Sequence, residues 1–220
     1  MDTFSKSDPI LFLFLKQNNV WQKIGQTEVI HDNLSPQWVT KVPVQYNFEK
    51  NDQFRLEVYD IDDETQINNI KAHDPLGHLE FTLHEVVTCI DQIMKKQLVN
   101  PAKPTIKSYV KIVAEEIQSG AISEIFIFKT NCMLSESSGL YFYIVYKMRA
   151  PGQYTPLYKS EVRKSGNNKL IDWNETALGT TDLCNDNVDQ EIKIEFFRSE
   201  TSGSHKNMGH IITTLGVLKS

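Results

Sequence analysis

The chain has 220 residues, of which 40% are hydrophobic and 23% are charged, the ordinary balance of a globular protein. Its formal net charge of −5 argues against a broad basic face for nucleic acid. The same charge argues against simple electrostatic attachment to anionic lipid, unless a cation first reverses the local sign. Cys89, Cys132 and Cys184 are odd in number and widely spaced, which argues against a disulfide framework and fits a reducing cytosol.

Membrane anchors are not indicated by the sequence. The apolar run 10–15 has six residues, well below the roughly 20 that span a bilayer, and it lacks the basic leader of a secretory signal. Residue 2 is Asp rather than Gly, so N-myristoylation is not indicated either. We therefore expect a cytoplasmic protein whose contact with membranes is peripheral.

Strand signals dominate the chain. Residues 54–58 alternate apolar and polar side chains, as a half-buried strand does. Similar segments, rich in β-branched and aromatic residues, are 10–15, 79–83, 109–113, 122–128, 140–146 and 192–197. Turn-forming residues separate them, and many short strands with turns between them predict an all-β sandwich. One helix is expected, over residues 83–98, where Val86, Val87 and Ile90 recur at helical spacing.

A weak internal repeat divides the chain in two. The stretch Arg55-Leu-Glu-Val-Tyr59 is echoed by Lys193-Ile-Glu-Phe-Phe197, and the segment from Thr27 to Trp38 is echoed by the segment from Ser160 to Trp173. The offset stays between about 130 and 138 residues, which is the size of a domain rather than of a solenoid repeat. We expect two similar domains, at residues 1–116 and 117–220.

Acidic residues gather at matching loop positions of the first half. These are Asp2 and Asp8 before the first strand, Asp60 and Asp62 after the strand that ends at Tyr59, and Asp74 at the end of the following loop. If the loops meet at one end of a sandwich, the carboxylates repel one another, and a divalent cation removes that penalty. Calcium suits such a site, because it accepts six to eight oxygen ligands in flexible geometry. The alternative is that these Asp side chains only cap local turns.

These loops resemble those of a known family. Asp2-Thr-Phe-Ser-Lys-Ser-Asp8-Pro9 resembles the first calcium loop of C2 domains, and Val58-Tyr-Asp60-Ile-Asp62 with Asp74-Pro-Leu-Gly77 resembles the third. Among C2 proteins the chain resembles copines, which open with two such domains, in stretches that include Asn33-Leu-Ser-Pro36. The resemblance is specific over residues 1–116 and looser over 117–220. It implies two tandem antiparallel Greek-key β-sandwiches.

The resemblance also implies a function. The calcium ligands would be Asp2, Asp8, Asp60, Asp62 and Asp74, and the ion would bridge to an anionic phospholipid membrane. A cytoplasmic chain would then be recruited to the plasma membrane or to other membranes when calcium rises. Candidate membrane contacts are Phe4, Lys6, Ile70 and Lys71, since apolar tips enter the interface while Lys meets phosphate. For Ile70, packing within its own loop is an equal alternative.

The second half departs from the ligand pattern. Its equivalent positions hold Cys132, Ser138, Arg198, Glu200 and Lys206. One carboxylate beside two cations does not hold a divalent ion, so we expect no calcium there. Arg198 and Lys206 are expected to be solvated loop charges, with contact to lipid phosphate as the alternative. Compared with the family pattern, the first strand of the first domain, the last strand of the second and the C-terminal von Willebrand A-like domain are missing, which indicates a fragment or an incomplete gene model.

Two other functions compete with calcium-dependent lipid binding. The first is a calcium-independent scaffold that binds other proteins through sandwich faces or open edge strands. The second is a metal-dependent hydrolase, but no residue stands out as a nucleophile or general base. The sequence also lacks the Gly-x-Ser-x-Gly elbow and the glycine-rich phosphate loops, so we do not expect an enzyme.

Overall fold

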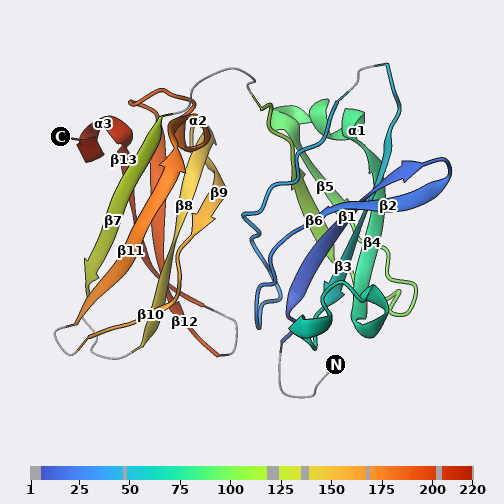
Figure 1. Ribbon diagram of the computed structural model, residues 1–220, viewed down its shortest axis with the longest axis horizontal. Coiled ribbons are helices and arrows are strands. Elements are labelled where there is room, and N and C mark those ends of the chain that lie inside the picture. The colour runs from blue at the N-terminus through green and yellow to red at the C-terminus, as the bar shows by residue number, and fades with distance from the viewer. Residues whose placement is uncertain are drawn as a thin grey trace. The chain divides into compact units, whose positions relative to one another are not determined.

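The computed structural model describes residues 6–46, 49–117, 124–134, 139–166, 169–201 and 205–219. The chain divides into two compact units, Met1–Ile117 and Gln118–Ser220. Both units consist mainly of antiparallel strands (Figure 1). The prediction of an all-β fold is confirmed.

The first unit contains two sheets. Its strands are β1 (Pro9–Gln17), β2 (Val20–Gln26), β3 (Gln53–Asp60), β4 (Asp74–Thr82), β5 (Ile93–Gln97) and β6 (Tyr109–Val113). One sheet has the order β2-β1-β3-β4, and β5 pairs with β6 in the other. Alternate residues of β3, namely Phe54, Leu56 and Val58, are buried in one cluster with Met94 of β5 and Val110 of β6. The two sheets therefore enclose a shared apolar core, as in a sandwich.

The helix expected over residues 83–98 ends at Val87. Helix α1 (Leu83–Val87) begins with a capping box, in which the Thr82 hydroxyl accepts the Glu85 N–H at 3.2 Å and the Glu85 carboxylate accepts the Thr82 N–H at 2.7 Å. Short 3-10 turns are η1 (Glu64–Gln66), η2 (Ile70–Ala72) and η3 (Ile90–Gln92).

Pairing with β6 explains why the longer helix does not form. Ile90, on the expected helical face, is 89% exposed, whereas Met94 and Leu98 are buried. Residues 93–97 instead pair with β6 along their whole length. The prediction was wrong because a few apolar residues matched the helical spacing, while tertiary pairing decided the conformation.

Residues 27–46 run along the first unit without strand assignment in the described range. The Glu28 carboxylate fixes part of this segment, because its two oxygens accept the N–H groups of Val39 at 2.7 Å and Thr40 at 3.1 Å. Gly25 of β2 lies directly beneath Val42, and a Cβ atom at position 25 would meet Val42 Cγ1 at 2.5 Å. The absence of a side chain at Gly25 thus allows the segment to lie close to the sheet.

We expect Gly25→Ala to lower the free energy of unfolding by about 1–3 kcal/mol, the usual cost of overpacking. The added methyl group overlaps only with the Val42 side chain, so the double variant Gly25→Ala with Val42→Ala should be more stable than the sum of the single effects predicts. Denaturant unfolding of the four proteins in this cycle measures the coupling. Strict additivity would show that Val42 does not lie against Gly25.

The second unit also has two sheets. Its strands are β7 (Ile125–Met133), β8 (Leu140–Ala150), β9 (Gln153–Lys159), β10 (Arg163–Lys164), β11 (Leu170–Gly179), β12 (Glu191–Ser199) and β13 (Lys206–Thr214), and its helices are α2 (Thr180–Cys184) and α3 (Leu215–Lys219). One sheet has the order β10-β8-β12-β13 with β9 on β8, and β11 pairs with β7 in the other. Strands predicted near 140–146 and 192–197 are confirmed as β8 and β12.

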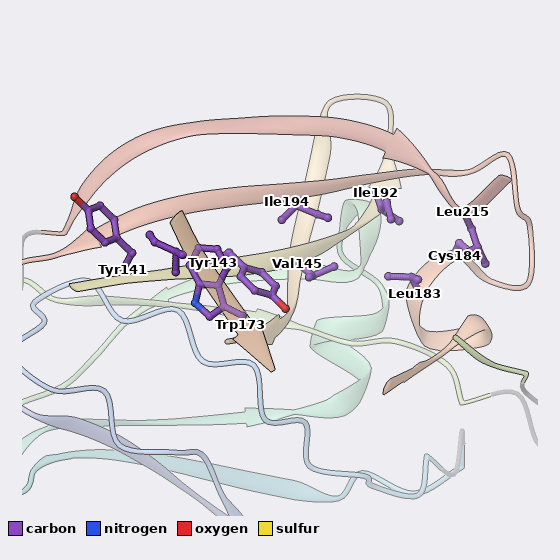
Figure 2. Packing of buried hydrophobic residues seen from close by; sticks show 10 residues of the cluster. Tyr141, Tyr143, Val145, Trp173, Leu183, Cys184, Ile192, Ile194 and Leu215 are labelled. Atoms are coloured by element: carbon purple, nitrogen blue, oxygen red, sulfur yellow. The ribbon is translucent and has the colours of Figure 1, made fainter. Parts of the chain in front are cut away.

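The core of the second unit is built around Trp173 (Figure 2). This side chain is 1% exposed, and its ring packs edge-on against Tyr143 with centroids 5.2 Å apart. Tyr143 comes from β8 and Trp173 from β11, while Ile192 and Ile194 of β12 complete the same cluster. Residues of both sheets thus share one core, so the second unit is also a sandwich.

The two units repeat the same local hydrogen bonds. In the first unit, the Thr27 hydroxyl accepts the Leu11 N–H at 3.0 Å, and the Thr27 N–H donates to the Leu11 carbonyl at 2.9 Å. In the second, the Ser160 hydroxyl accepts the Tyr143 N–H at 2.9 Å, and the Ser160 N–H donates to the Tyr143 carbonyl at 2.9 Å. Thr27 and Ser160 are the residues that the sequence repeat pairs with each other.

We expect Ser160→Ala to destabilise the protein by about 1–3 kcal/mol, because it leaves the N–H of the fully buried Tyr143 without its acceptor. Ser160→Thr is the matched control, since the first unit uses a threonine hydroxyl in the same arrangement. Hydrogen exchange at the Tyr143 amide provides a local measurement. Equal protection in the Ala and Thr variants would contradict the role of this hydroxyl.

Candidate functional site

Three of the predicted acidic positions lie together at one end of the first unit. The register of β1 with β3 pairs Pro9 with Asp60, and the register of β3 with β4 pairs Asp60 with Asp74. Because Asp8 directly precedes Pro9, three neighbouring strands each bring one carboxylate to this end. Figure 1 shows the start of β1, the end of β3 and the start of β4 there, beside η1 and η2. We call this region the acidic end.

A β-bulge sets the alignment of Asp74. Val58 pairs with Gly77 and Tyr59 with Pro75, so β4 carries one extra residue at this point. Gly77 has φ of +144°, a conformation that side chains rarely adopt. The bulge shifts the register by one residue and brings Asp74 opposite Asp60.

Asp8 and Asp60 accept hydrogen bonds from backbone groups at the acidic end. The Asp8 N–H donates to Asp60 Oδ1 at 2.6 Å, and Asp8 Oδ1 accepts the N–H of Asp32 at 2.6 Å. Asp8 Oδ2 lies 3.3 Å from His31 Nδ1. These contacts connect the start of β1, the end of β3 and the segment that follows β2.

The acidic end includes residues that the sequence patterns did not reveal. His31 lies between two carboxylates, since its other ring nitrogen is 3.0 Å from Glu64 Oε1. Asp63 caps η1, and hydrogen bonds from the Thr65 hydroxyl, the Gln66 amide and the Thr65 N–H hold the pKa of its carboxyl below the ordinary value. Asp63 therefore stays ionised and adds negative charge near the predicted ligands. The run of acidic residues at 62–64 was the available signal.

Asp62, one of the two remaining predicted ligands, does not belong to the row of paired strand residues. Asp62 is exposed and follows Ile61, which is buried and whose N–H donates to the Asp8 carbonyl at 3.1 Å. Asp2 lies outside the described residues. No three Asp, Glu, His or Cys side chains among the described residues stand close enough together to hold a metal ion. Carboxylate oxygens are the donors that calcium prefers, and the strand register brings three of these positions to one end. The ligand set itself stays a prediction.

The predicted membrane contacts differ in how far their side chains are exposed. Ile70 is half-buried and packs against Ile10, Phe12 and Ile61, which corresponds to the alternative of a self-packed loop. Lys71 beside it is exposed, and Lys6 is half-buried, while Phe4 lies outside the described residues. Across the described ranges, every helix is too short or too polar to traverse a bilayer.

The second unit has cationic residues where the first has Asp60 and Asp74. Arg198 pairs with Tyr141 on one side and with Lys206 on the other, as Asp60 pairs with Pro9 and Asp74. A bulge with Gly209 opposite Phe196 precedes this position, as Gly77 does in the first unit.

Glu200 and Cys132, two further positions of the second unit, are also poorly suited to bind a metal ion. Arg198 Nε lies 3.3 Å from the Glu200 carboxylate, so the one acidic residue is already paired with a cation. Burial raises the pKa of the Cys132 thiol, which disfavours the thiolate that a metal would bind. Ser138 lies outside the described residues. Among the described residues at these positions, the donors are therefore one carboxylate already paired with a cation and a thiol, not the set of oxygens that calcium prefers.

Residues 1–100 match the C2 domain family. The chain is 27% identical over 220 residues to Copine-B, 29% over 225 residues to Copine-E and 26% over 218 residues to Copine-A, all of Dictyostelium discoideum. These alignments cover 97%, 97% and 96% of this chain but 40%, 37% and 35% of the relatives. The chain thus spans less than half the length of the curated relatives that it matches.

Two solved structures of Extended-Synaptotagmin 2 also align with the chain. The structure that contains its SMP domain and two of its C2 domains gives a TM-score of 0.34 at 16% identity, covering 98% of this chain and 45% of that one. The structure of the two C2 domains alone gives 0.31 at 15% identity, covering 99% and 74%. The C2 match over the first 100 residues and the copines that align over nearly all of the chain confirm that this chain resembles copines.

Proposed function

We propose that the first unit binds anionic phospholipid membranes in a calcium-dependent manner through the acidic end. The observation that carries this proposal is the row formed by Pro9, Asp60 and Asp74 across three paired strands, which brings carboxylates from distant parts of the sequence together. The resemblance to copines and the C2 match support it. Bound calcium would supply positive charge and coordination positions for phosphate oxygens.

Charge explains why such docking depends on calcium. Asp8, Asp60, Asp62 and Asp74 share the acidic end with the ionised Asp63, so this surface repels anionic lipid when no cation is present. The exposed Lys71 in the adjacent η2 turn is suited to contact lipid phosphate once the repulsion is removed. Ile70 is turned into the unit's own apolar cluster, so we assign it a packing role.

The second unit contributes differently in this proposal. Arg198 and Lys206 stand at the positions of Asp60 and Asp74, and like charges from the protein repel a divalent cation. We therefore assign calcium binding to the first unit alone.

We expect the parent chain to co-sediment with vesicles that contain phosphatidylserine in calcium but not in chelator. Asp60→Asn with Asp62→Asn should reduce this binding by about tenfold or more, because calcium affinity depends on the charge of the ligands. Asn keeps an oxygen for the hydrogen bond from the Asp8 N–H, so the local fold should persist. Equal pelleting with calcium and with chelator would contradict the proposal.

The matched control changes two acidic residues at the opposite end of β3. Asp52 directly precedes this strand of eight residues, roughly 26 Å from Asp60 along the strand, and Glu49 lies three residues before it. Glu49→Gln with Asp52→Asn alters the net charge as much as the test variant does. This control should bind vesicles like the parent. Calorimetry of the Asp60→Asn, Asp62→Asn chain should show no calcium-specific heat, and residual heat would place a calcium site elsewhere, including the second unit.

A calcium-independent protein interaction is the second candidate function. Among the described strands, β7 pairs only with β11, which leaves its other edge open. Ile125, Ile127 and Met133 of this strand are 71%, 61% and 77% exposed. An open edge with apolar side chains is suited to pair with an extended strand of another protein.

We expect Ile127→Pro to abolish such pairing, since proline adds a ring and removes the backbone donor. Ile127→Thr is the control, because it keeps the donor and suits a strand. The two variants are compared in pull-downs with chelator present, after circular dichroism has confirmed that both fold. A partner that binds both variants equally, or only in calcium, would contradict a role for this edge.

A further inference from the structure

The sequence contains two hydroxyl residues followed by proline, Ser35-Pro36 and Thr155-Pro156. Both dipeptides satisfy the sequence requirement of a kinase that needs proline directly after the residue it phosphorylates. Recognition also requires that the acceptor enter the kinase active site, which is easiest at exposed loop tips. The structural settings of the two dipeptides differ in this respect.

Ser35 lies in a short segment that is held by hydrogen bonds on both sides. On one side the Asn33 N–H donates to the Ser7 carbonyl at 2.9 Å, and on the other Trp38 Nε1 donates to the Pro9 carbonyl at 3.3 Å. Ser35 between these anchors is exposed, and Leu34 beside it is 65% exposed. The segment has no strand assignment from residue 27 to residue 46, so presenting Ser35 to an enzyme disrupts no strand pairing.

Thr155 is held in a sheet. It lies within β9, opposite Lys147 of β8, and its side chain is half-buried. A kinase would have to separate β9 from β8 to reach it, which costs the hydrogen bonds of that pair. The folded chain therefore offers Ser35 rather than Thr155.

We propose that Ser35 is a phosphorylation site for a proline-directed protein kinase. In this reaction the Ser35 hydroxyl oxygen forms a bond to the γ-phosphorus of ATP, and the bond from that phosphorus to the bridging oxygen breaks. ADP leaves with the electron pair, and the hydroxyl proton passes to the catalytic base of the kinase. The product carries a charge of about −1.5 to −2 at neutral pH.

The position of Ser35 gives this charge a consequence at the acidic end, which rests on the proposed membrane function. Ser35 is two residues from Asn33, at most about 7 Å along the chain, and Asn33 contacts the residue before Asp8. The screening length at physiological salt is about 8 Å and the path continues beyond Asn33 to Asp8, so the phosphate acts on the acidic end through a partly screened field that is stronger at low salt. It opposes the positive charge that calcium brings and weakens docking on anionic lipid by roughly a few-fold.

The first test treats the full chain with a proline-directed kinase and magnesium-ATP and locates phosphate by mass spectrometry. We expect about one phosphate per chain on Ser35, loss of labelling in Ser35→Ala, and unchanged labelling in Thr155→Ala. Labelling of Thr155 in preference to Ser35 would overturn the proposal. So would an unlabelled folded chain when a synthetic peptide of residues 29–41 is labelled under the same conditions.

The second test compares calcium-dependent vesicle binding before and after kinase treatment. The parent should bind a few-fold less tightly once phosphorylated, while kinase-treated Ser35→Ala should bind like the untreated chain. Unchanged binding by the fully phosphorylated parent would refute the regulatory consequence. Labelling of Ser35 does not involve lipid or calcium, so its result stands even if the untreated chain binds no vesicles and the proposed function fails.

Discussion

The antiparallel register of β3 with β1 and β4 is the constraint on which the acidic end depends. It places Pro9 and Asp74 on either side of Asp60, although more than 50 residues of sequence separate Asp8 from Asp60. A slip of one residue would turn every side chain of β3 to the opposite face. The buried alternation of Phe54, Leu56 and Val58 prevents such a slip, so the apolar core of the first unit also fixes the geometry of its charged end.

The same framework carries opposite charge in the second unit. The bulge at Gly209 and the hydroxyl of Ser160 reproduce arrangements of the first unit, yet Arg198 and Lys206 occupy its strand ends. Register and bulge depend on backbone conformation and on buried residues, whereas the side chains at the strand ends are partly exposed and contribute little to packing. Their charge can therefore change without loss of the sandwich, and the two units can share a fold without sharing a ligand.

Patterns that repeat every few residues in the sequence were sufficient to predict several of the strands. Alternation identified β3, β6, β8 and β12, and acidic residues at strand ends predicted the row with Asp60 and Asp74. The sequence did not predict β5, because residues 83–98 match helical spacing until β6 pairs with them. It also did not predict that His31 lies between Asp8 and Glu64. Their approach depends on how residues 27–46 lie along the unit, which Gly25 and Glu28 determine through contacts with no sequence pattern of their own.

Hydrogen bonds from backbone N–H groups help the first unit to tolerate its acidic cluster. From sequence, converging carboxylates are expected to require a metal ion, since like charges at short range raise their own pKa values. In the structure, Asp8 accepts the Asp32 N–H and lies against His31, and Asp60 accepts the Asp8 N–H. Hydrogen bonds from backbone N–H groups to a carboxylate are stronger than those between neutral groups, so they offset part of the repulsion between these side chains. Calcium binding would then be a competition with backbone donors for the same oxygens, and its affinity would be lower than the number of carboxylates suggests. A weaker site of this kind would respond to changes in calcium concentration instead of remaining saturated, which is what the proposed reversible docking on a membrane would require.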